Sequence, residues 1–205
     1  MTRNQIHVMT IGLLLANVMS GLDATIINTA LPAIIADLHG ISCMGLIVSV
    51  FLLGMSVSTL LWSKFGERMG NKKAFELAVV LFIAGSALEG LSPDILFFVC
   101  ARLLMGIGAG GLGSIPYIIF GNVYENLHTR SIILGFVSAV YGAASITGPL
   151  VGGLIVDSFS WHWIFYINVP IGLLIIAIIH FSYKEKIESV DKKVDWLGSF
   201  LLVSG

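Results

Sequence analysis

Long hydrophobic runs alternate with short polar segments along the whole chain. A helix needs about 20 apolar residues to cross a bilayer. Six runs come close to that length and predict membrane spans over residues 8–31, 44–62, 74–91, 95–120, 132–156 and 163–183. A seventh run opens at Trp196 and is too short to cross before the sequence stops at Gly205. We therefore expect an all-α, polytopic membrane protein with a six-helix bundle and the start of a seventh span.

The first run is predicted to remain in the mature protein as a span. Asn17 and Asp23 interrupt it, and no cleavage site of small residues follows a short apolar core, as a signal peptide would require.

Composition supports a lipid environment. Hydrophobic residues make up 57% of the 205 positions and charged residues only 11%, whereas soluble domains carry about 25% charged residues. The net charge of -1 argues against a nucleic-acid partner. Cys43 and Cys100 lie in apolar context without metal-ligand spacing. Because no nucleophile–base pair or ligand set is visible either, we expect no cofactor, no metal and no enzymatic activity.

The charges of the loops alternate sharply. Asp37, Asp94 and Asp157 occupy three loops that contain no Lys or Arg. Basic residues occupy the other loops and the N-terminus: Arg3, Lys64, Arg68, Lys72, Lys73, Arg130, Lys184, Lys186, Lys192 and Lys193. By the positive-inside rule, the N-terminus and the basic loops are cytoplasmic. This predicts a multi-pass protein of the plasma membrane.

The same pattern predicts a domain organisation. Residues 1–183 would form a six-span transporter half, residues 184–195 a charged cytoplasmic linker, and residues 196–205 the start of a seventh span. Spans one to three and spans four to six could be related as inverted units. Pro32 and Pro116 fall late in the first span of these two units, which faintly suggests a 3+3 inverted repeat.

Asp23 and Arg102 are predicted to be the two ionisable residues well inside the apolar runs. A charge in hydrocarbon is costly, so such residues usually face a protein interior and pair. Both lie about 10–12 Å below the same membrane surface at 1.5 Å per residue, so they can meet. Because Arg stays protonated, Asp23 would be the group that loads and releases a proton. A static buried ion pair is the alternative.

One face of the first span is polar. Asn17, Gly21, Ala24 and Asn28 recur at helical spacing. The asparagines either line a cavity or hydrogen-bond neighbouring helices. We predict a substrate cavity lined by Asn17, Thr25, Asn28, Tyr117 and Tyr141.

Small residues follow similar faces on two later spans. Gly106, Gly110 and Gly113 lie on the face of Arg102, and the fifth span carries Gly135, Ser138, Gly142, Ser145, Pro149 and Gly152. Such faces let helices approach closely. The glycines either serve this packing alone or, together with Pro149, shape a bend that function needs. The short loop from Lys64 to Lys73 is either a plain basic anchor or a latch between two helix ends.

Five stretches together resemble the major facilitator superfamily, and within it the fourteen-span drug:proton antiporter branch. They are LDATIINTALP at residues 22–32, SKFGERMGNKK at 63–73, RLLMGIGAG at 102–110, GAASITGPLVGG at 142–153 and WHWIFYINVPIG at 161–172. The chain differs from the family pattern at Ser63, where Gly is usual, Glu67 (Asp), Met105 (Gln) and His162 (Arg).

The resemblance implies roles for the matched positions. Asp23 would couple transport to protons, assisted by Arg102. A cytoplasmic latch would comprise Glu67, Arg68, Gly70 and Lys72, and an antiporter motif would comprise Gly142, Gly148, Pro149, Gly152 and Gly153. Its implied function is proton-coupled export of amphipathic drug-like compounds, with the bilayer, protons and such substrates as partners.

Transport by rocking halves requires a second half. The chain would therefore act as the N-terminal half of an exporter, pairing with another chain or with itself. The alternative is a truncated or split accessory membrane fragment that does not transport alone.

Overall fold

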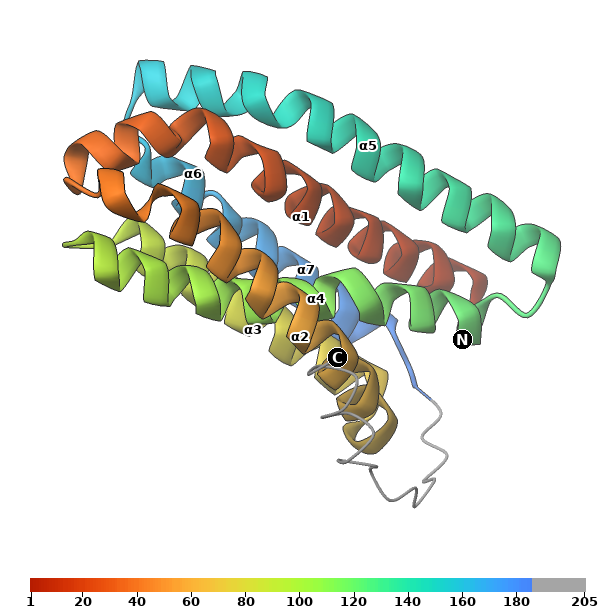
Figure 1. The fold of residues 1–205 in the computed structure, drawn as a ribbon. Coiled ribbons are helices and arrows are strands. Elements are labelled where there is room, and N and C mark those ends of the chain that lie inside the picture. The colour runs from red at the N-terminus through yellow and green to blue at the C-terminus, as the bar shows by residue number, and fades with distance from the viewer. Residues whose placement is uncertain (186–205) are drawn as a thin grey trace.

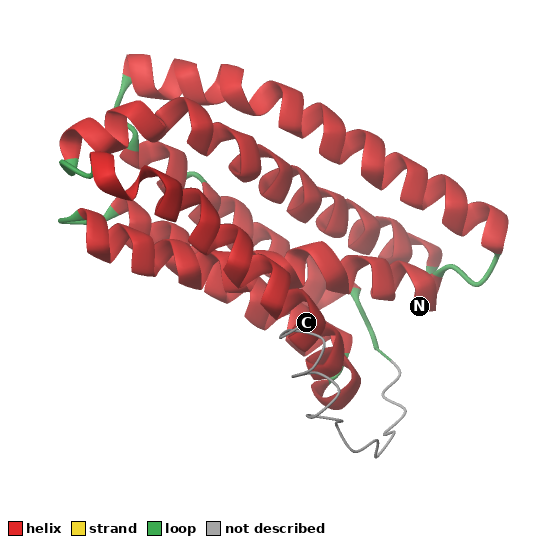
Figure 2. Ribbon diagram, viewed as in Figure 1, coloured by secondary structure: helices red, strands yellow, loops and turns green. Residues whose placement is uncertain are grey.

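The computed structural model describes residues 1–185, so the predicted linker beyond Glu185 and the seventh run lie outside the described residues. Within 1–185 the chain is helical and has no strand (Figure 2). The elements are α1 (Arg3–Asp37), a 3-10 turn η1 (Ile41–Cys43), α2 (Met44–Met69), α3 (Asn71–Gly90), α4 (Ile95–Val123), α5 (Leu127–Ser158), α6 (His162–Tyr166) and α7 (Asn168–Ser182).

The first five predicted spans each correspond to one helix and the sixth to α6 and α7, and most helices continue past their apolar runs. α1 begins at Arg3 because Thr2 caps it: the Thr2 hydroxyl accepts from the Gln5 amide, and the Gln5 side chain accepts from the Thr2 amide. Five helical stretches are long and apolar enough to cross a membrane, with α6 and α7 counted together. α3 falls short of that measure among the described helices because four of its 20 residues are charged: Lys72, Lys73, Glu76 and Glu89.

The sixth predicted span is broken, which the sequence prediction did not anticipate. α6 ends at Tyr166 and α7 begins at Asn168, on either side of Ile167. Pro170 explains the break, because proline lacks an amide hydrogen and its ring clashes with the carbonyl four residues earlier, which belongs to Tyr166.

The helices form two packed groups (Figure 1). One is the α1–α5 pair. The other is the α2–α3–α4 group, in which α2 and α3 both pack against α4. α7 bridges the groups through α1 and α3, and direct contact between α1 and α4 is less extensive. We call the boundary between α1 and α4 the seam. α1 packs against α5, and α4 packs against α2. The first helix of each three-span unit therefore packs against the middle helix of the other unit, consistent with a 3+3 repeat.

The loops alternate between two ends of the bundle. The basic end contains the N-terminus, Gly70, the Tyr124–Asn126 loop and the residues after α7; the acidic end contains the loops at Leu38, Leu91 and Phe159. Two hydrophobic clusters fill the core. Met19 and Met105 belong to the cluster that extends to the basic end, and Ile26 and Phe98 to the other.

Glycines set the spacing inside the α2–α3–α4 group. A Cβ at Gly106 would lie 2.5 Å from the Phe51 carbonyl oxygen of α2, and one at Gly85 2.5 Å from the Met105 amide nitrogen. Gly113, which we predicted to share the packing face of Gly106, meets nothing within 4 Å. Only part of the predicted glycine face on α4 is therefore a packing surface.

We expect Gly106→Ala to destabilise the protein by about 1–3 kcal/mol, because the added methyl group overpacks the α2–α4 contact. Thermal unfolding of the detergent-solubilised protein measures this. Gly113→Ala on the same helix is the matched control and should unfold at the wild-type temperature or slightly above it. Equal effects of the two substitutions would contradict this account of α2–α4 packing.

Candidate functional site

A buried charge cluster crosses the seam. Arg102 on α4 is 1% exposed, and its Nη1 lies 3.6 Å from Oδ2 of Asp23 on α1. The same Nη1 donates a hydrogen bond to Oε2 of Glu89 on α3, at 3.1 Å. The guanidinium carbon lies 4.3 Å from the centroid of the Phe51 ring on α2, a favourable cation–π position. The approach of Asp23 and Arg102, predicted from their depths, is confirmed.

Glu89 is the residue that the sequence analysis missed. We expected Asp23 and Arg102 to be the ionisable residues of the interior, and this was wrong, because Glu89 is 0% exposed. It lies one residue from the end of α3, so it looked like a flanking charge. Its spacing from Phe82 and Ser86, by seven and three residues, places it on their face. That period was the available signal.

The cluster contains two carboxyl groups and one cation, and their hydrogen bonding is incomplete. Among the described residues, both carboxyl oxygens of Asp23, Oε1 of Glu89 and Nε of Arg102 have no hydrogen-bond partner. One guanidinium balances only one carboxylate, and an uncompensated buried charge is strongly destabilising. The arrangement is therefore neutral when one of the two acids keeps its proton.

A polar network from α7 adjoins the cluster. The Asn168 amide donates to Ser86 Oγ at 3.0 Å, and Ser86 donates to the Phe165 carbonyl at 2.9 Å. Asn168 also lies close to the Asp23 carboxyl group. Asn168 begins α7 directly after the break at Ile167. The break therefore leaves the Phe165 carbonyl free to accept from Ser86 and places the Asn168 side chain beside the charge cluster.

Part of the predicted latch connects two helices at the basic end of the bundle. Lys72 Nζ donates to the His180 carbonyl at 2.5 Å. Gly70 adopts a positive φ of 92°, which glycine tolerates. Glu67 and Arg68 are exposed on the last turn of α2. The acid that completes the contact is Glu185, whose carboxylate accepts from the Asn71 and Lys72 amides at 2.6 and 3.1 Å.

Glu185 thus caps the N-terminus of α3, where exposed amides and the helix dipole favour an anion. Burial, and then the negative charge of Glu185, raise the pKa of Tyr183 to about 12. His180 Nδ1 also lies 3.1 Å from Glu76 Oε1. Glu185 had no predicted role, because the residues after the last span were expected to form a charged cytoplasmic linker.

Comparisons with known proteins identify the family of the chain. A family model described as the Major Facilitator Superfamily covers residues 13–198. The chain belongs to this superfamily. Multidrug resistance protein 3 of Bacillus subtilis (strain 168) is 36% identical over 193 residues, which are 94% of this chain and 38% of that protein. Efflux pump dotC of Dothistroma septosporum is 37% identical over 200 residues, 95% of this chain and 34% of that protein.

The superfamily fold is also shown by a solved structure. The proton:xylose symporter XylE aligns with a TM-score of 0.77 and 17% identity over 88% of this chain and 45% of that chain. This likeness concerns the fold alone. The chain spans about a third of the length of the curated relatives that it matches, at 38% and 34% of the two named. Superfamily members are transporters and not enzymes.

The structure shows how one departure from the superfamily pattern is accommodated beside Arg102. Met105 stands where the family usually has Gln, whose amide could make a stronger polar contact beside Arg102. Its sulfur accepts a hydrogen bond from Arg102 Nη1 at 3.6 Å. Thioether sulfur is a weak acceptor, so the contact survives in weaker form and Glu89 supplies the strong one.

The five residues predicted to line a substrate cavity fall into two sets. Asn17 is buried and donates to the Leu13 carbonyl, and Thr25 donates to carbonyls of its own helix. Asn28, Tyr117 and Tyr141 are exposed on the surface of the half. In this half the five do not form one inward-facing set, so a shared cavity stays a prediction that depends on a second half.

The predicted antiporter motif on α5 divides in the same way. A Cβ at Gly152 would lie 2.7 Å from a side-chain carbon of Ile26, and Gly148 packs against Thr25, so these glycines bring α5 close to α1. Gly142 meets nothing within 4 Å, Gly153 is near only Thr29, and Pro149 lies within the helix on its exposed side. Of the two alternatives for this small-residue face, packing holds for Gly148 and Gly152 but not for Gly135 and Gly142, which meet nothing within 4 Å among the described residues.

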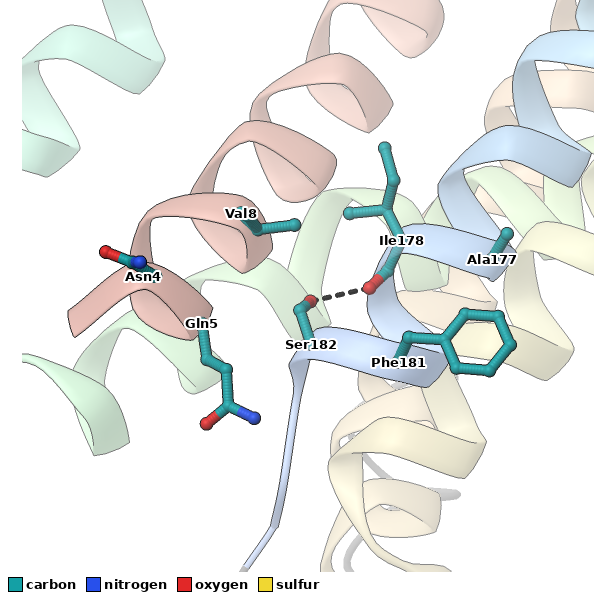
Figure 3. Close-up of a pocket in the computed structure, with 7 residues that line it drawn as sticks. All are labelled: Asn4, Gln5, Val8, Ala177, Ile178, Phe181 and Ser182. Atoms are coloured by element: carbon teal, nitrogen blue, oxygen red, sulfur yellow. Dashed lines mark hydrogen bonds between the residues drawn. The ribbon is translucent and has the colours of Figure 1, made fainter. Parts of the chain in front are cut away.

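An apolar groove of about 420 Å³ lies elsewhere, between the start of α1 and the end of α7 (Figure 3). It is lined by Asn4, Gln5, Val8, Ala177, Ile178, Phe181 and Ser182. The Ser182 hydroxyl donates a hydrogen bond to the Ile178 carbonyl of the same helix. The groove holds no ionisable side chain and lies at the basic end, away from the charge cluster.

We expect Arg102→Met to make stability depend more steeply on pH than it does in the wild type. Without a cation, Asp23 and Glu89 must both stay protonated in the folded protein, whereas the unfolded chain releases both protons as pH rises. The folded state then binds more protons, so stability falls with increasing pH. At mildly alkaline pH we expect a loss of about 3–5 kcal/mol, and less at mildly acidic pH.

Thermal unfolding at the two pH values measures this difference. Arg68→Met, which removes an exposed Arg, is the matched control and should follow the wild type at both. An Arg102→Met protein whose loss of stability is the same at both pH values would contradict the buried pairing.

Proposed function

We propose that this chain is the N-terminal half of a proton-coupled exporter of amphipathic, drug-like compounds. The relatives named multidrug resistance protein and efflux pump support drug export. The observation that carries proton coupling is the approach of Asp23 to Arg102 across the seam, with both side chains buried.

The coupling step follows from the charges. Ionised Asp23 attracts Arg102 and draws α1 toward α4, whereas protonated Asp23 is neutral and releases this attraction. Because the two residues belong to the first helices of the two three-span units, the proton would bias how the α1–α5 pair sits against the α2–α3–α4 group. A bias between two arrangements is what alternating access requires.

The second half would complete the transport path. α2 and α5 each bury a single stripe, Ile47, Phe51, Gly54, Ser58, Trp62 and Gly66 on α2 and Val137, Ala144, Gly148 and Gly152 on α5. Their remaining faces are available to another half. We propose that Asn28, Tyr117 and Tyr141, with Asn17 and Thr25 behind them, line the substrate path between the halves.

The proposed orientation places the basic end in the cytoplasm, following the positive-inside rule. The contact between Lys72, Glu185 and the start of α3 would then act as a cytoplasmic latch.

The test of coupling is proton-driven efflux from everted vesicles in which this half is completed by a C-terminal half. We expect Asp23→Asn to abolish efflux driven by a pH gradient, because the amide cannot exchange a proton. Drug binding measured without a gradient should persist.

Asp157→Asn is the matched control, since Asp157 is an exposed acid at the end of α5, and it should leave efflux unchanged. Efflux by Asp23→Asn at the wild-type rate and with the wild-type dependence on the pH gradient would rule out the coupling role.

A further inference from the structure

Glu89 occupies a position that the coupling scheme of Asp23 and Arg102 does not explain. A buried acid beside a buried Arg, with nothing else nearby, forms a permanent ion pair, because Arg does not give up its proton. Such a pair is a poor proton carrier, because protonating the acid leaves the buried cation without a counter-ion. A functional proton site needs something that keeps the cation satisfied while the acid is neutral.

Glu89 is placed to keep Arg102 paired while Asp23 is neutral. Arg102 Nη1 donates a hydrogen bond to Glu89 at 3.1 Å, while Asp23 lies 3.6 Å from the same atom, outside hydrogen-bond distance. Glu89 and Arg102 also belong to the same packed group, whereas Asp23 faces them across the seam. The guanidinium therefore sits with the acid of its own group.

We infer that Glu89 is a positioning residue that holds Arg102 on its own side of the seam and so leaves the proton on Asp23. The inference rests on the proposed coupling role of Asp23. When Asp23 releases its proton, two carboxylates compete for one guanidinium, and Arg102 can shift toward α1 without leaving either a buried cation or both anions unpaired.

The other groups around the cluster fit this assignment. From α7 the Asn168 side-chain amide lies close to Asp23, and from α5 Tyr141 packs against Gly21, two residues before Asp23. From α6, Tyr166 donates to the Gly90 carbonyl at 2.6 Å, directly beside Glu89. From α2 the contact is the Phe51 ring. Among the described residues, these partners add no second cation, so Glu89 and Asp23 share Arg102.

The proton can be located by infrared spectroscopy of the chain in lipid nanodiscs, through the C=O stretching band of a buried carboxylic acid, whose frequency falls in protein labelled with 13C in its Asp carboxyl groups if that acid is Asp23. We expect wild-type protein to show this band at neutral pH. Glu89→Gln should lose it there and regain it only at more acidic pH, because Arg102 is then left with Asp23 as its anion. The expected shift of the midpoint is at least tenfold in proton concentration, about one pH unit.

Glu76→Gln is the matched control, since it removes a carboxyl group from the same helix outside the cluster, and it should keep the wild-type band. A wild-type midpoint in Glu89→Gln would overturn the inference. If Glu89→Gln does not fold, Asp23→Asn decides: no band at neutral pH is expected, because Glu89 is then ionised against Arg102, and a persisting band would place the proton on Glu89 and overturn the inference.

Efflux measurements distinguish a failure of this inference from a failure of the proposed function. In the completed transporter, Glu89→Gln should move the pH profile of efflux to more acidic pH by a similar amount, an effect that loss of packing alone would not produce. If Asp23→Asn leaves efflux intact, the proposed function fails. If Asp23→Asn abolishes efflux and Glu89→Gln keeps the wild-type pH profile, only the role of Glu89 fails.

Discussion

Arg102 brings a permanent positive charge into the apolar interior, and the rest of the half is arranged around it. Its guanidinium contacts a side chain from α1, from α2 and from α3, while its own helix supplies Met105. A charge at the centre of a bilayer costs about 2.5–3.5 kcal/mol on insertion scales. The acids of two different helices, α1 and α3, offset this cost only if those helices stay packed against α4. The charge therefore ties the tertiary arrangement to the protonation of the cluster.

The glycines make that arrangement possible. Gly106 lets the backbone of α2 approach α4, and Gly85 does the same between α3 and α4. Larger residues would separate these helices and lengthen the contacts of Arg102. The close packing is confined to the α2–α3–α4 group and to the α1–α5 pair. Between α1 and α4 the contact is less extensive, so the seam is where a change of charge can move helices at the least cost in packing.

The sequence predicted what depends on hydrophobic periodicity and length. The six spans, their alternating direction and the approach of Asp23 to Arg102 all follow from counting residues along helices. It did not predict features that depend on which helix faces which. Glu89 lies near the end of α3, and only the packing of α3 against α4 brings it to Arg102. The break at Ile167 had a local signal in Pro170, but the contact of Glu185 with α3 required the end of α7 to return beside the start of α3.

The location of the cluster constrains how a proton could drive transport. Asp23, Glu89 and Arg102 lie within one half, between two hydrophobic clusters, and not on the faces of α2 and α5 that are free to meet another half. A substrate in a path between halves would therefore not need to touch the proton site. Coupling would instead pass through α1, which carries Asp23 on its buried side and Asn28 on its exposed side, five residues apart. A shift of α1 at the seam would move both, and this favours an indirect competition between proton and substrate over direct displacement.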